Sequence, residues 1–452
     1  MSSSLRLSSG AAFYLVTIGA AVGLGSIWRF PYLAGRYGGG LFVLAFLAAC
    51  VFIAVPLLIA EFYIGKMSRS SPPRAAGVLA ARAGLSRGWD AIGSLGTLSS
   101  FMVFSYYTMI AGWVVSYAVR TANGSLAGLS GDAISGRFHD FVASPVRVWA
   151  WQLGFVAITG VVSSSGLKAG IERISVFRAP ALLLLLLVLV GYSLVVGDTE
   201  HGLAFAFAPR SGTLSSALLL AAVSQAFFAT GVGMALMIAY GSYIPDDTSL
   251  LRSAVFIVVS IVVVSLLATL LVFPLVFRYH LDPAQGAKLV FEVLPVAFAE
   301  MPGGRLVGTI FFTLLALAAL TPAIATLEPA VAWLEGRGLA RRPAALAVCT
   351  AGALLGIGSV LSFNAWADVH PLGTVPGFGT RTFFDIVDFI SSDLLLPLGA
   401  LITSLFVGWV LPRKLADSRG DAPVRQIDRW VLLLLRYVCP IAIFAVLVGA
   451  LS

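Results

Sequence analysis

One stretch of sequence decides the fold of this chain: Gly19-Ala20-Ala21-Val22-Gly23-Leu24-Gly25-Ser26-Ile27-Trp28-Arg29-Phe30-Pro31. Its three glycines interrupt a long apolar segment just before a charge and a proline. Glycine and proline both weaken the hydrogen-bond ladder of a helix. Unpaired backbone in hydrocarbon is costly, so a break at membrane depth persists only where it lines a cavity or packs inside protein. We therefore expect a discontinuous helix that faces the interior of a membrane protein.

The composition supports this class of protein. Of the 452 residues, 59% are hydrophobic and 11% are charged, which excludes an ordinary soluble globular protein. Apolar stretches near the roughly 20 residues that one span needs recur along the whole chain. We expect an all-α integral membrane protein with eleven spans, at residues 10–34, 40–65, 92–119, 148–164, 173–196, 214–242, 253–277, 305–334, 342–362, 383–411 and 429–450.

The loops between these spans predict the orientation. Lysine and arginine gather after the second, eighth and tenth spans, and the alternate loops hold fewer of them. The positive-inside rule then places the N-terminus in the cytoplasm and, with eleven spans, the C-terminus outside. We expect a multi-pass protein of the plasma (inner) membrane. This loop bias accounts for the formal net charge of +8, so no nucleic-acid partner is expected.

A second break, Thr230-Gly231-Val232-Gly233, lies in the sixth expected span. Breaks in corresponding positions of two halves are typical of a transporter whose binding site lies near the membrane midplane. We therefore divide the chain into a first five-helix repeat (1–196), a second repeat (197–411) and an appended last span (412–452). The loop 279–303, rich in proline and glycine, is expected to form a re-entrant cap over the outer mouth.

The motif Gly23-Leu24-Gly25-Ser26-Ile27-Trp28-Arg29-Phe30-Pro31 resembles the neurotransmitter:sodium symporter family, which includes bacterial LeuT-like amino-acid transporters. The resemblance implies a LeuT-like 5+5 inverted repeat with helices 1 and 6 broken, and transport by alternating access rather than enzymatic catalysis. It continues in order through Gly38-Gly39-Gly40, Ser105-Tyr106-Tyr107, Gly112-Trp113, Gln225-Ala226-Phe227-Phe228, Tyr240-Gly241-Ser242-Tyr243, Met301-Pro302-Gly303-Gly304, Leu327-Glu328-Pro329 and Phe384-Asp385-Ile386-Val387-Asp388.

The resemblance implies a central substrate site between spans 1, 3, 6 and 8. Free amides near the first break and the Tyr107 hydroxyl would bind a carboxylate, and free carbonyls at both breaks would receive an ammonium group. The wall is uncharged, which predicts a neutral, hydrophobic amino acid, and Gly231 stands where the family usually has a larger residue. Tyr107 could instead be a core tyrosine. The implied residues are Ala20, Ala21, Gly23, Gly25, Val103, Tyr107, Phe228, Ala229, Gly231, Met234 and Thr326.

The same resemblance implies an outer gate. Arg29 and Asp388 would form its ion pair, because an arginine within the membrane is costly unless it is paired. Phe228 would be the lid and Gln225 would lie beside the arginine. Tyr243 is a further gate residue. The alternative for Arg29 is that it caps the broken helix.

At the inner gate this chain departs from the family. The family's N-terminal arginine and tryptophan positions fall on Ser4 and Leu7, and its acid after the eighth span falls on Gly336. Both members of one ion pair are therefore missing. A shifted pair of Arg6 with Glu335 is the alternative.

The sodium sites implied by the resemblance are also degraded. The positions of the first site's side-chain ligands hold Ser26, Ala229 and Ile261, so most of the oxygens that a hard cation prefers are missing. The counter-charge that some relatives place in span 7 is absent too, so chloride is not expected.

The second sodium site would use the carbonyls of Gly19, Val22 and Ala318 and the hydroxyl of Thr321. Its other hydroxyl position is Pro322, which offers no ligand. Arg178, in the fifth span, could be a built-in cation at these carbonyls, since a guanidinium stays charged. Alternatively, Arg178 extends to the cytoplasmic interface.

Three functions follow. The first is a secondary transporter of a neutral amino acid with sodium coupling weakened or lost, and the second is an ordinary sodium symporter that uses one remaining site. The third is an amino-acid sensor that does not transport. If protons drive transport, Glu61 is the first candidate and Glu328 the second, although Glu61 could be structural. The expected partners are a small-molecule amino acid and the lipid bilayer; no cofactor or metal centre is expected, and the oligomeric state is open.

Overall fold

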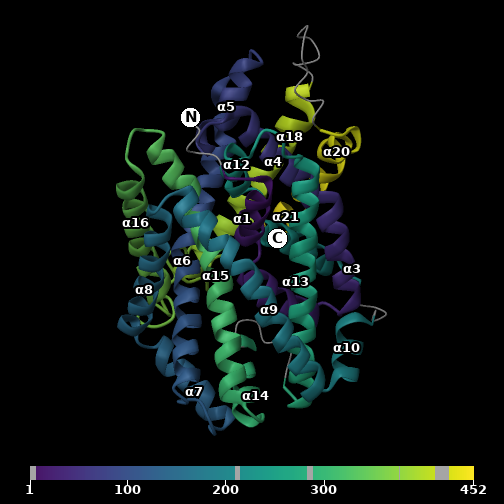
Figure 1. The fold of residues 1–452 in the computed structure, drawn as a ribbon. Helices are drawn as coiled ribbons and strands as arrows, with labels where there is room; N and C mark the ends of the chain where they lie inside the picture. Colours follow the sequence, from purple (N-terminus) through teal and green to yellow (C-terminus); the bar gives the residue numbers. More distant parts are fainter. Residues whose placement is uncertain (1–6, 209–213, 282–288, 376, 413–426, 452) are drawn as a thin grey trace.

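The computed structural model describes residues 7–208, 214–281, 289–375, 377–412 and 427–451. The regular elements of this part of the chain are helices (Figure 1). They are α1 (Gly10–Ala21), α2 (Phe30–Arg36), α3 (Gly40–Ala49), α4 (Val55–Ser68), α5 (Pro72–Arg82), α6 (Ala91–Ala122), α7 (Gly131–Val142), α8 (Pro145–Ser164), α9 (Arg173–Val196), α10 (Thr199–Phe207), α11 (Ser216–Thr230), α12 (Leu236–Ser242), α13 (Leu250–Arg278), α14 (Leu294–Glu300), α15 (Gly304–Glu335), α16 (Arg341–Leu361), α17 (Phe383–Asp388), α18 (Leu396–Leu405), α20 (Arg429–Leu433) and α21 (Cys439–Leu451).

The expected spans match these helices. Within the described ranges, nine helices are long and apolar enough to cross a membrane, and α1 joins the helix Gly25–Arg36 as a pair bent by 56°. The sixth expected span is α11 followed by α12, with the second break between them. Together these elements account for the eleven spans, and the prediction of an all-α membrane protein is confirmed.

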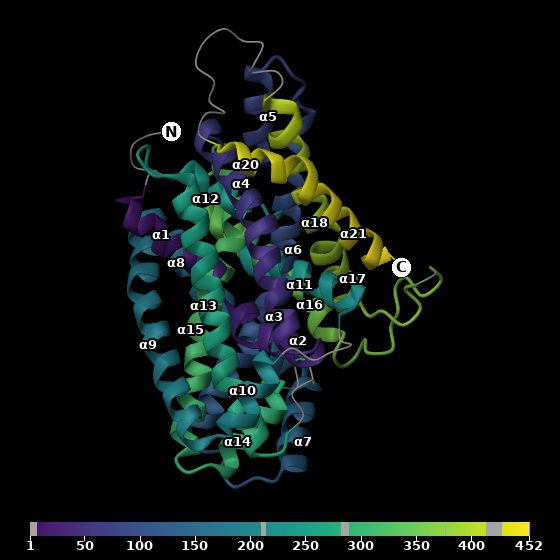
Figure 2. The same cartoon turned by 90° about the vertical axis from the view of Figure 1, so that its right-hand side faces the viewer.

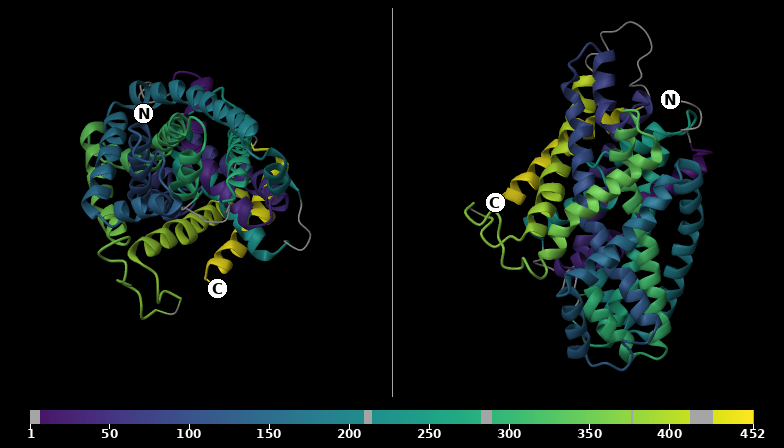
Figure 3. Two further views of the ribbon diagram at one scale, coloured as in Figure 1. Left: turned by 90° about the horizontal axis from the view of Figure 1, so that it is seen from below. Right: turned by 90° about the vertical axis from the view of Figure 1, so that its left-hand side faces the viewer.

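The exterior of the bundle is apolar. Phe177 and Val195 on α9 are 81% and 85% exposed, and Ile441 on α21 is 71% exposed. Such exposure suits hydrocarbon as the surrounding medium rather than water. The helices run mainly along one axis, and α20 and α21 lie along the outside of the bundle (Figures 2 and 3).

The two ends of the bundle differ. Helix α5 lies at one end, and α7 and α14 lie at the other (Figures 1 and 2). Residues 289–303 of the expected cap form the π-helical turn Leu289–Val293 and α14, which packs against α15. Residues 282–288 of that loop lie outside the described residues.

Each break has a local backbone cause. After α1, Val22 adopts an extended conformation (φ −80°, ψ 102°), and a π-helical turn then runs over Gly25–Arg29. After α11, the backbone is left-handed at Gly231 (φ 67°) and Gly233 (φ 85°), a region that glycine enters without steric cost. The breaks occur at the predicted glycines because these residues tolerate the turns and, lacking side chains, admit close neighbours.

Candidate functional site

A small cavity lies between the two breaks, bounded by α6 and α15. All eleven residues expected at the substrate site line it, together with Leu24, Leu236 and Pro322. The expected residues are Ala20, Ala21, Gly23, Gly25, Val103, Tyr107, Phe228, Ala229, Gly231, Met234 and Thr326. The structure therefore brings together residues from four segments that are far apart in the sequence.

Large side chains close this cavity. Its volume is about 40 Å³, whereas one water needs roughly 10–15 Å³, so it holds a few waters at most. A methyl group built on Gly25 would stand 2.8 Å from the Phe228 ring, and one built on Gly23 would stand 2.7 Å from the Pro322 ring. The glycines thus let these rings approach the first break closely. An amino acid would fit only after some of the wall moves.

The polar groups at the cavity are few. The Tyr107 hydroxyl is buried and has no hydrogen-bond partner in the described structure, so it is available to a ligand. The Ser26 hydroxyl, next to the first break, is likewise buried without a partner. The Thr326 hydroxyl donates to the carbonyl of Ala323 at 2.9 Å and is already engaged. No lining residue carries a charged side chain, so a charged substrate side chain would be buried without a partner.

On one side of the cavity, the expected ion pair of Arg29 with Asp388 is not formed. The Arg29 guanidinium lies 4.6 Å from the centroid of the Phe228 ring, a cation–π contact. Asp388 accepts a hydrogen bond of 3.1 Å from the Ser392 hydroxyl. Gln225 lies at the first break, where its side-chain amide donates to the carbonyl of Gly25 at 2.9 Å. Arg29 therefore contacts the Phe228 ring. The Asp388 carboxylate instead accepts a hydrogen bond from a residue one helical turn further along the chain.

Arg178 lies at the expected second sodium site. Its side chain is buried, with the residue 3% exposed. The guanidinium donates to the carbonyls of Leu317 (2.8 Å), Ala318 (3.3 Å) and Gly19 (3.2 Å). The structure shows no hydrogen bond from Arg178 to the carbonyl of Val22. The third acceptor is instead the carbonyl of Leu317. The side chain is directed between α1 and α15 rather than toward the membrane interface.

The other groups at this site are hydroxyls. Thr321 donates to the same Gly19 carbonyl at 2.6 Å. The Ser175 hydroxyl is buried without a partner in the described structure. No carboxylate forms an ion pair with Arg178 within the described ranges, so its charge is balanced by carbonyl dipoles, which also bind cations. A sodium ion does not fit beside the guanidinium, because the two cations would compete for the same carbonyl oxygens and repel each other.

The first sodium site is also poor in oxygen ligands. Ala229 and Ile261 are buried and apolar, and the Ser26 hydroxyl is the one side-chain oxygen of the three expected positions. Sodium, as a hard cation, requires several oxygens. The residues present do not fit the family's first site.

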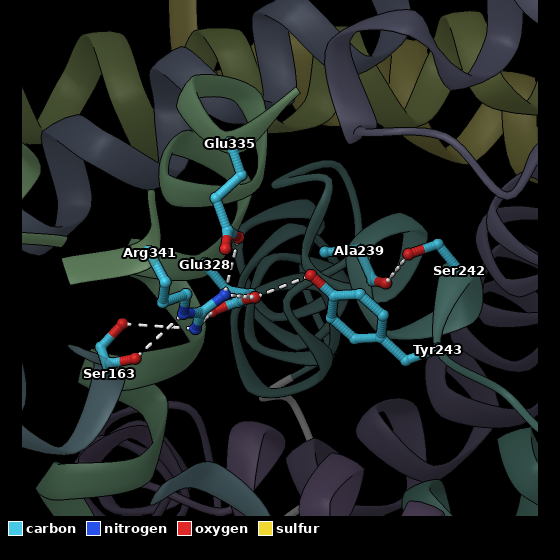
Figure 4. Close-up of polar contacts among 7 residues, drawn as sticks. All are labelled: Ser163, Ala239, Ser242, Tyr243, Glu328, Glu335 and Arg341. Carbon is cyan, nitrogen blue, oxygen red and sulfur yellow. Dashed lines mark hydrogen bonds and ion pairs between the residues drawn. The ribbon is translucent and has the colours of Figure 1, made fainter. Parts of the chain in front are cut away.

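On the opposite side of the cavity, a polar network joins four helices (Figure 4). The hydroxyl of Tyr243, the residue that directly follows α12, donates to Glu328 of α15 at 2.8 Å. Arg341, the first residue of α16, pairs with Glu328 at 2.6 Å and with Glu335 at 3.0 Å. Its Nε also donates to the carbonyl of Ser163 on α8 at 3.0 Å. The Glu328 side chain is fully buried, so this is an interior ion pair.

This network was not foreseen. Arg341 is one of the basic residues that follow the eighth span. The alternative inner pair of Glu335 with Arg6 lies partly outside the described residues, because Arg6 is not among them. Instead, Glu335 pairs with Arg341. The available signal was the spacing of Glu328 and Glu335, seven residues apart on one helix face, with Arg337 and Arg341 two and six residues after Glu335. Leu7, at the family's tryptophan position, donates its backbone N–H to the carbonyl of Tyr243 at 3.3 Å.

Glu61 stabilises the second break. The residue is 1% exposed, and Oε1 accepts a hydrogen bond of 2.6 Å from the backbone N–H of Gly233. Its Oε2 has no partner in the described structure. Span 2 thus supplies an acceptor to an amide that the broken helix leaves unpaired.

Two broken helices around a closed, uncharged cavity are typical of a multi-pass secondary transporter. The model of the family described as the sodium:neurotransmitter symporter family matches residues 6–131 and 145–448. The chain belongs to this family, and the predicted family membership is confirmed. The protein is a transporter and not an enzyme.

Relatives of this chain cover it almost completely. It is 37% identical to the uncharacterized sodium-dependent transporter YhdH of Bacillus subtilis over 99% of this chain and 98% of the relative. It is 29% identical to an uncharacterized sodium-dependent transporter of Haemophilus influenzae over 98% and 97% of the two chains. The crystal structure of MhsT in complex with L-phenylalanine superposes with a TM-score of 0.87 at 36% identity, covering 98% of this chain and 99% of that one.

Proposed function

We propose that the protein moves a neutral, hydrophobic amino acid across the plasma membrane by alternating access, with its N-terminus in the cytoplasm and its C-terminus outside. The observation that carries this proposal is the uncharged cavity at the two breaks, where the only titratable side chain is the Tyr107 phenol. MhsT was solved with L-phenylalanine, a neutral hydrophobic amino acid, which supports the same substrate class here.

The cavity offers separate partners for the two charged groups of an amino acid. The Tyr107 hydroxyl and the backbone amides at the first break would receive the carboxylate, since free amides at a helix terminus favour an anion. Backbone carbonyls at the second break would receive the ammonium group. Apolar side chains such as Val103 and Met234 would surround the substrate side chain.

Sodium coupling is weakened or lost in this proposal, because Arg178 acts as a built-in cation at the second sodium site. Its three carbonyl contacts, from α1 and α15, are contacts of the kind that a sodium ion would make. A guanidinium cannot be released to either side of the membrane and does not deprotonate under physiological conditions. It therefore cannot couple transport to a sodium gradient.

Exchange or proton coupling would then drive transport. Of the two candidate acids, Glu328 is held by Arg341 and Tyr243 and is poorly placed to change its protonation state. Glu61 forms no ion pair within the described residues and contacts the second break directly through the N–H of Gly233. The structure therefore favours Glu61 over Glu328 as a proton carrier, if protons are coupled.

Two gates would alternate around the cavity. Arg29 and Phe228 would close the outer side, and Asp388 would bind Arg29 when that side closes further. Tyr243 and Glu328 would close the inner side, replacing the family's missing pair. The hydrogen bond between them joins α12 to α15.

The test is uptake of labelled neutral amino acids into proteoliposomes, with sodium replaced by choline at constant osmolarity. Uptake that survives the replacement supports the proposal, and acceleration by a pH gradient or by internal unlabelled substrate would then distinguish proton coupling from exchange. Uptake that requires sodium would favour the second candidate, a sodium symporter with one working site, as the names of the relatives suggest. Binding without uptake under every condition would indicate a sensor.

A further inference from the structure

Leu236 fills the space that Gly231 leaves at the second break. A methyl group built on Gly231 would stand 2.7 Å from Cδ1 of Leu236, so the tip of the leucine lies directly over the glycine. Leu236 is 3% exposed and lines the cavity. The glycine therefore does not widen the pocket by itself, because a side chain five residues further along the chain occupies the volume.

The position of Leu236 in its helix leaves its side chain adjustable. It is the first residue of α12, after a left-handed N-cap at Ala235 (φ 57°). Side chains on a helix lean toward its N-terminus, which directs this leucine into the break. Inside a helix the preceding turn excludes one of the three χ1 rotamers. Residues 231–235 before α12 form a non-helical turn, so the restriction imposed by a preceding helical turn does not apply to Leu236.

Two ring-bearing walls of the cavity, Phe228 and Pro322, are constrained. Phe228 lies under the Arg29 guanidinium at 4.6 Å. The ring of Pro322 is fixed to the backbone of α15. Leu236 has neither a polar anchor nor a ring that limits its rotation. Met234 and Leu24 also line the cavity without a polar anchor, but Leu236 is the side chain that lies over Gly231. It is therefore the wall next to the second break that can yield when the cavity of about 40 Å³ receives a larger side chain.

We infer that Leu236 is the adjustable wall of the substrate side-chain pocket and sets its size selectivity. The inference rests on the amino-acid transport proposed above. Leu236 covers Gly231 when the substrate side chain is small and turns aside for a branched or aromatic one, whose own burial replaces the lost contacts. The favoured substrates are then large hydrophobic amino acids, with an upper size limit that Leu236 determines rather than Gly231 alone.

The test is equilibrium binding of alanine, leucine, phenylalanine and tryptophan to the purified full chain, in sodium and in choline. Leu236→Ala is expected to shift the affinity ratio of tryptophan to alanine at least ~10-fold in favour of tryptophan, since one methylene in an apolar pocket changes discrimination by about 10–200-fold. Leu236→Phe is expected to shift it in the opposite direction. The opposed pair keeps the inference testable if one variant fails to fold.

A double-mutant cycle with Gly231→Ala tests direct contact. Alanine at φ 67° is strained, but this strain is common to both backgrounds and cancels in the cycle. Gly231→Ala is expected to weaken phenylalanine binding several-fold more in the natural background than in Leu236→Ala. Leu24, another leucine of the same cavity, supplies the control, because Leu24→Ala and Gly231→Ala are expected to be additive.

Two results would overturn the inference in distinguishable ways. If the natural protein binds the amino acids but both Leu236 variants keep its size order, Leu236 is not the adjustable wall and the proposed function stands. If the natural protein binds none of the four in either salt, the proposed function itself fails and the inference fails with it.

Discussion

The Arg178 guanidinium donates a hydrogen bond of 3.2 Å to the carbonyl of Gly19, just before the first break. Thr321 donates to the same carbonyl at 2.6 Å. A fixed cation on α9 and a hydroxyl on α15 thus share one acceptor of the broken helix. In the proposed function, this fixed cation takes the place of the ion at the second site.

Replacing Arg178 tests whether its charge substitutes for sodium. Arg178→Ala removes the fixed charge and leaves the carbonyl of Ala318 without a donor, because its helical partner Pro322 has no N–H, at a cost of about 1–3 kcal/mol. Sodium-free uptake is therefore expected to fall roughly 10–100-fold, and sodium is expected to restore part of it. Arg178→Lys, which keeps a cation, should retain more activity than Arg178→Ala. Proteoliposome uptake in sodium and in choline measures both. Unchanged sodium-independent uptake in the alanine variant would show that the charge has no such role.

Tyr107→Phe tests the carboxylate site. A hydrogen bond to a charged group contributes about 1.5–3 kcal/mol, so the dissociation constant for the substrate is expected to rise roughly 10–100-fold. The matched control is Tyr117→Phe. Tyr117 lies on the same helix, and its buried hydroxyl is also without a partner in the described structure, but it does not line the cavity. Equal losses in the two variants would contradict a direct contact between Tyr107 and the substrate.

Tyr243→Phe tests the inner gate. The variant loses the hydrogen bond between α12 and Glu328, and the inward-open state is expected to gain population by roughly 10-fold or more. Backbone amides of α1 should then exchange hydrogen for deuterium faster than in the natural protein. Tyr240→Phe is the control, since this buried tyrosine of α12 shows no hydrogen bond from its hydroxyl in the described structure. Identical exchange in all three proteins would exclude this gate.

Substitution of Arg341 tests how much the interior ion pair contributes to the stability of the protein. Removing one partner of a buried pair costs about 3–5 kcal/mol, because the other charge stays buried. Arg341→Met is therefore expected to lower the melting temperature of the purified protein clearly. The double variant Glu328→Met with Arg341→Met should regain most of the loss, since no buried charge remains unpaired. A double variant as unstable as Arg341→Met would show that Glu328 is not its main partner.

Two substitutions of Glu61 distinguish a structural role of its carboxylate from a role in proton coupling. Glu61→Gln keeps an oxygen that can accept from Gly233, so the melting temperature is expected to stay near that of the natural protein. Glu61→Ala removes the acceptor and is expected to cost about 1–3 kcal/mol. Uptake driven by a pH gradient should disappear in the glutamine variant if Glu61 carries the proton, whereas exchange of internal for external substrate should persist. Gradient-driven uptake that survives in Glu61→Gln would exclude the proton role.

Much of the substrate site could be predicted from the sequence. All eleven expected residues line one cavity, because the breaks that place them are local events at glycines and the motifs keep the family's spacing. Leu24, Leu236 and Pro322 were not predicted as lining residues. Whether a side chain of the first turn folds back over Gly231 depends on the left-handed backbone of Ala235, which composition and spacing do not reveal.

The sequence by itself determined the membrane class, the spans, the two breaks and the family, since these depend on local hydropathy, glycine and proline. Only the tertiary structure decided which partners the charged residues take. Arg178 contacts carbonyls of α1 and α15, Arg29 covers Phe228 rather than pairing with Asp388, and Arg341 joins Glu328. A long side chain can reach several partners, and the choice among them depends on which helix faces meet and how much water the packing excludes.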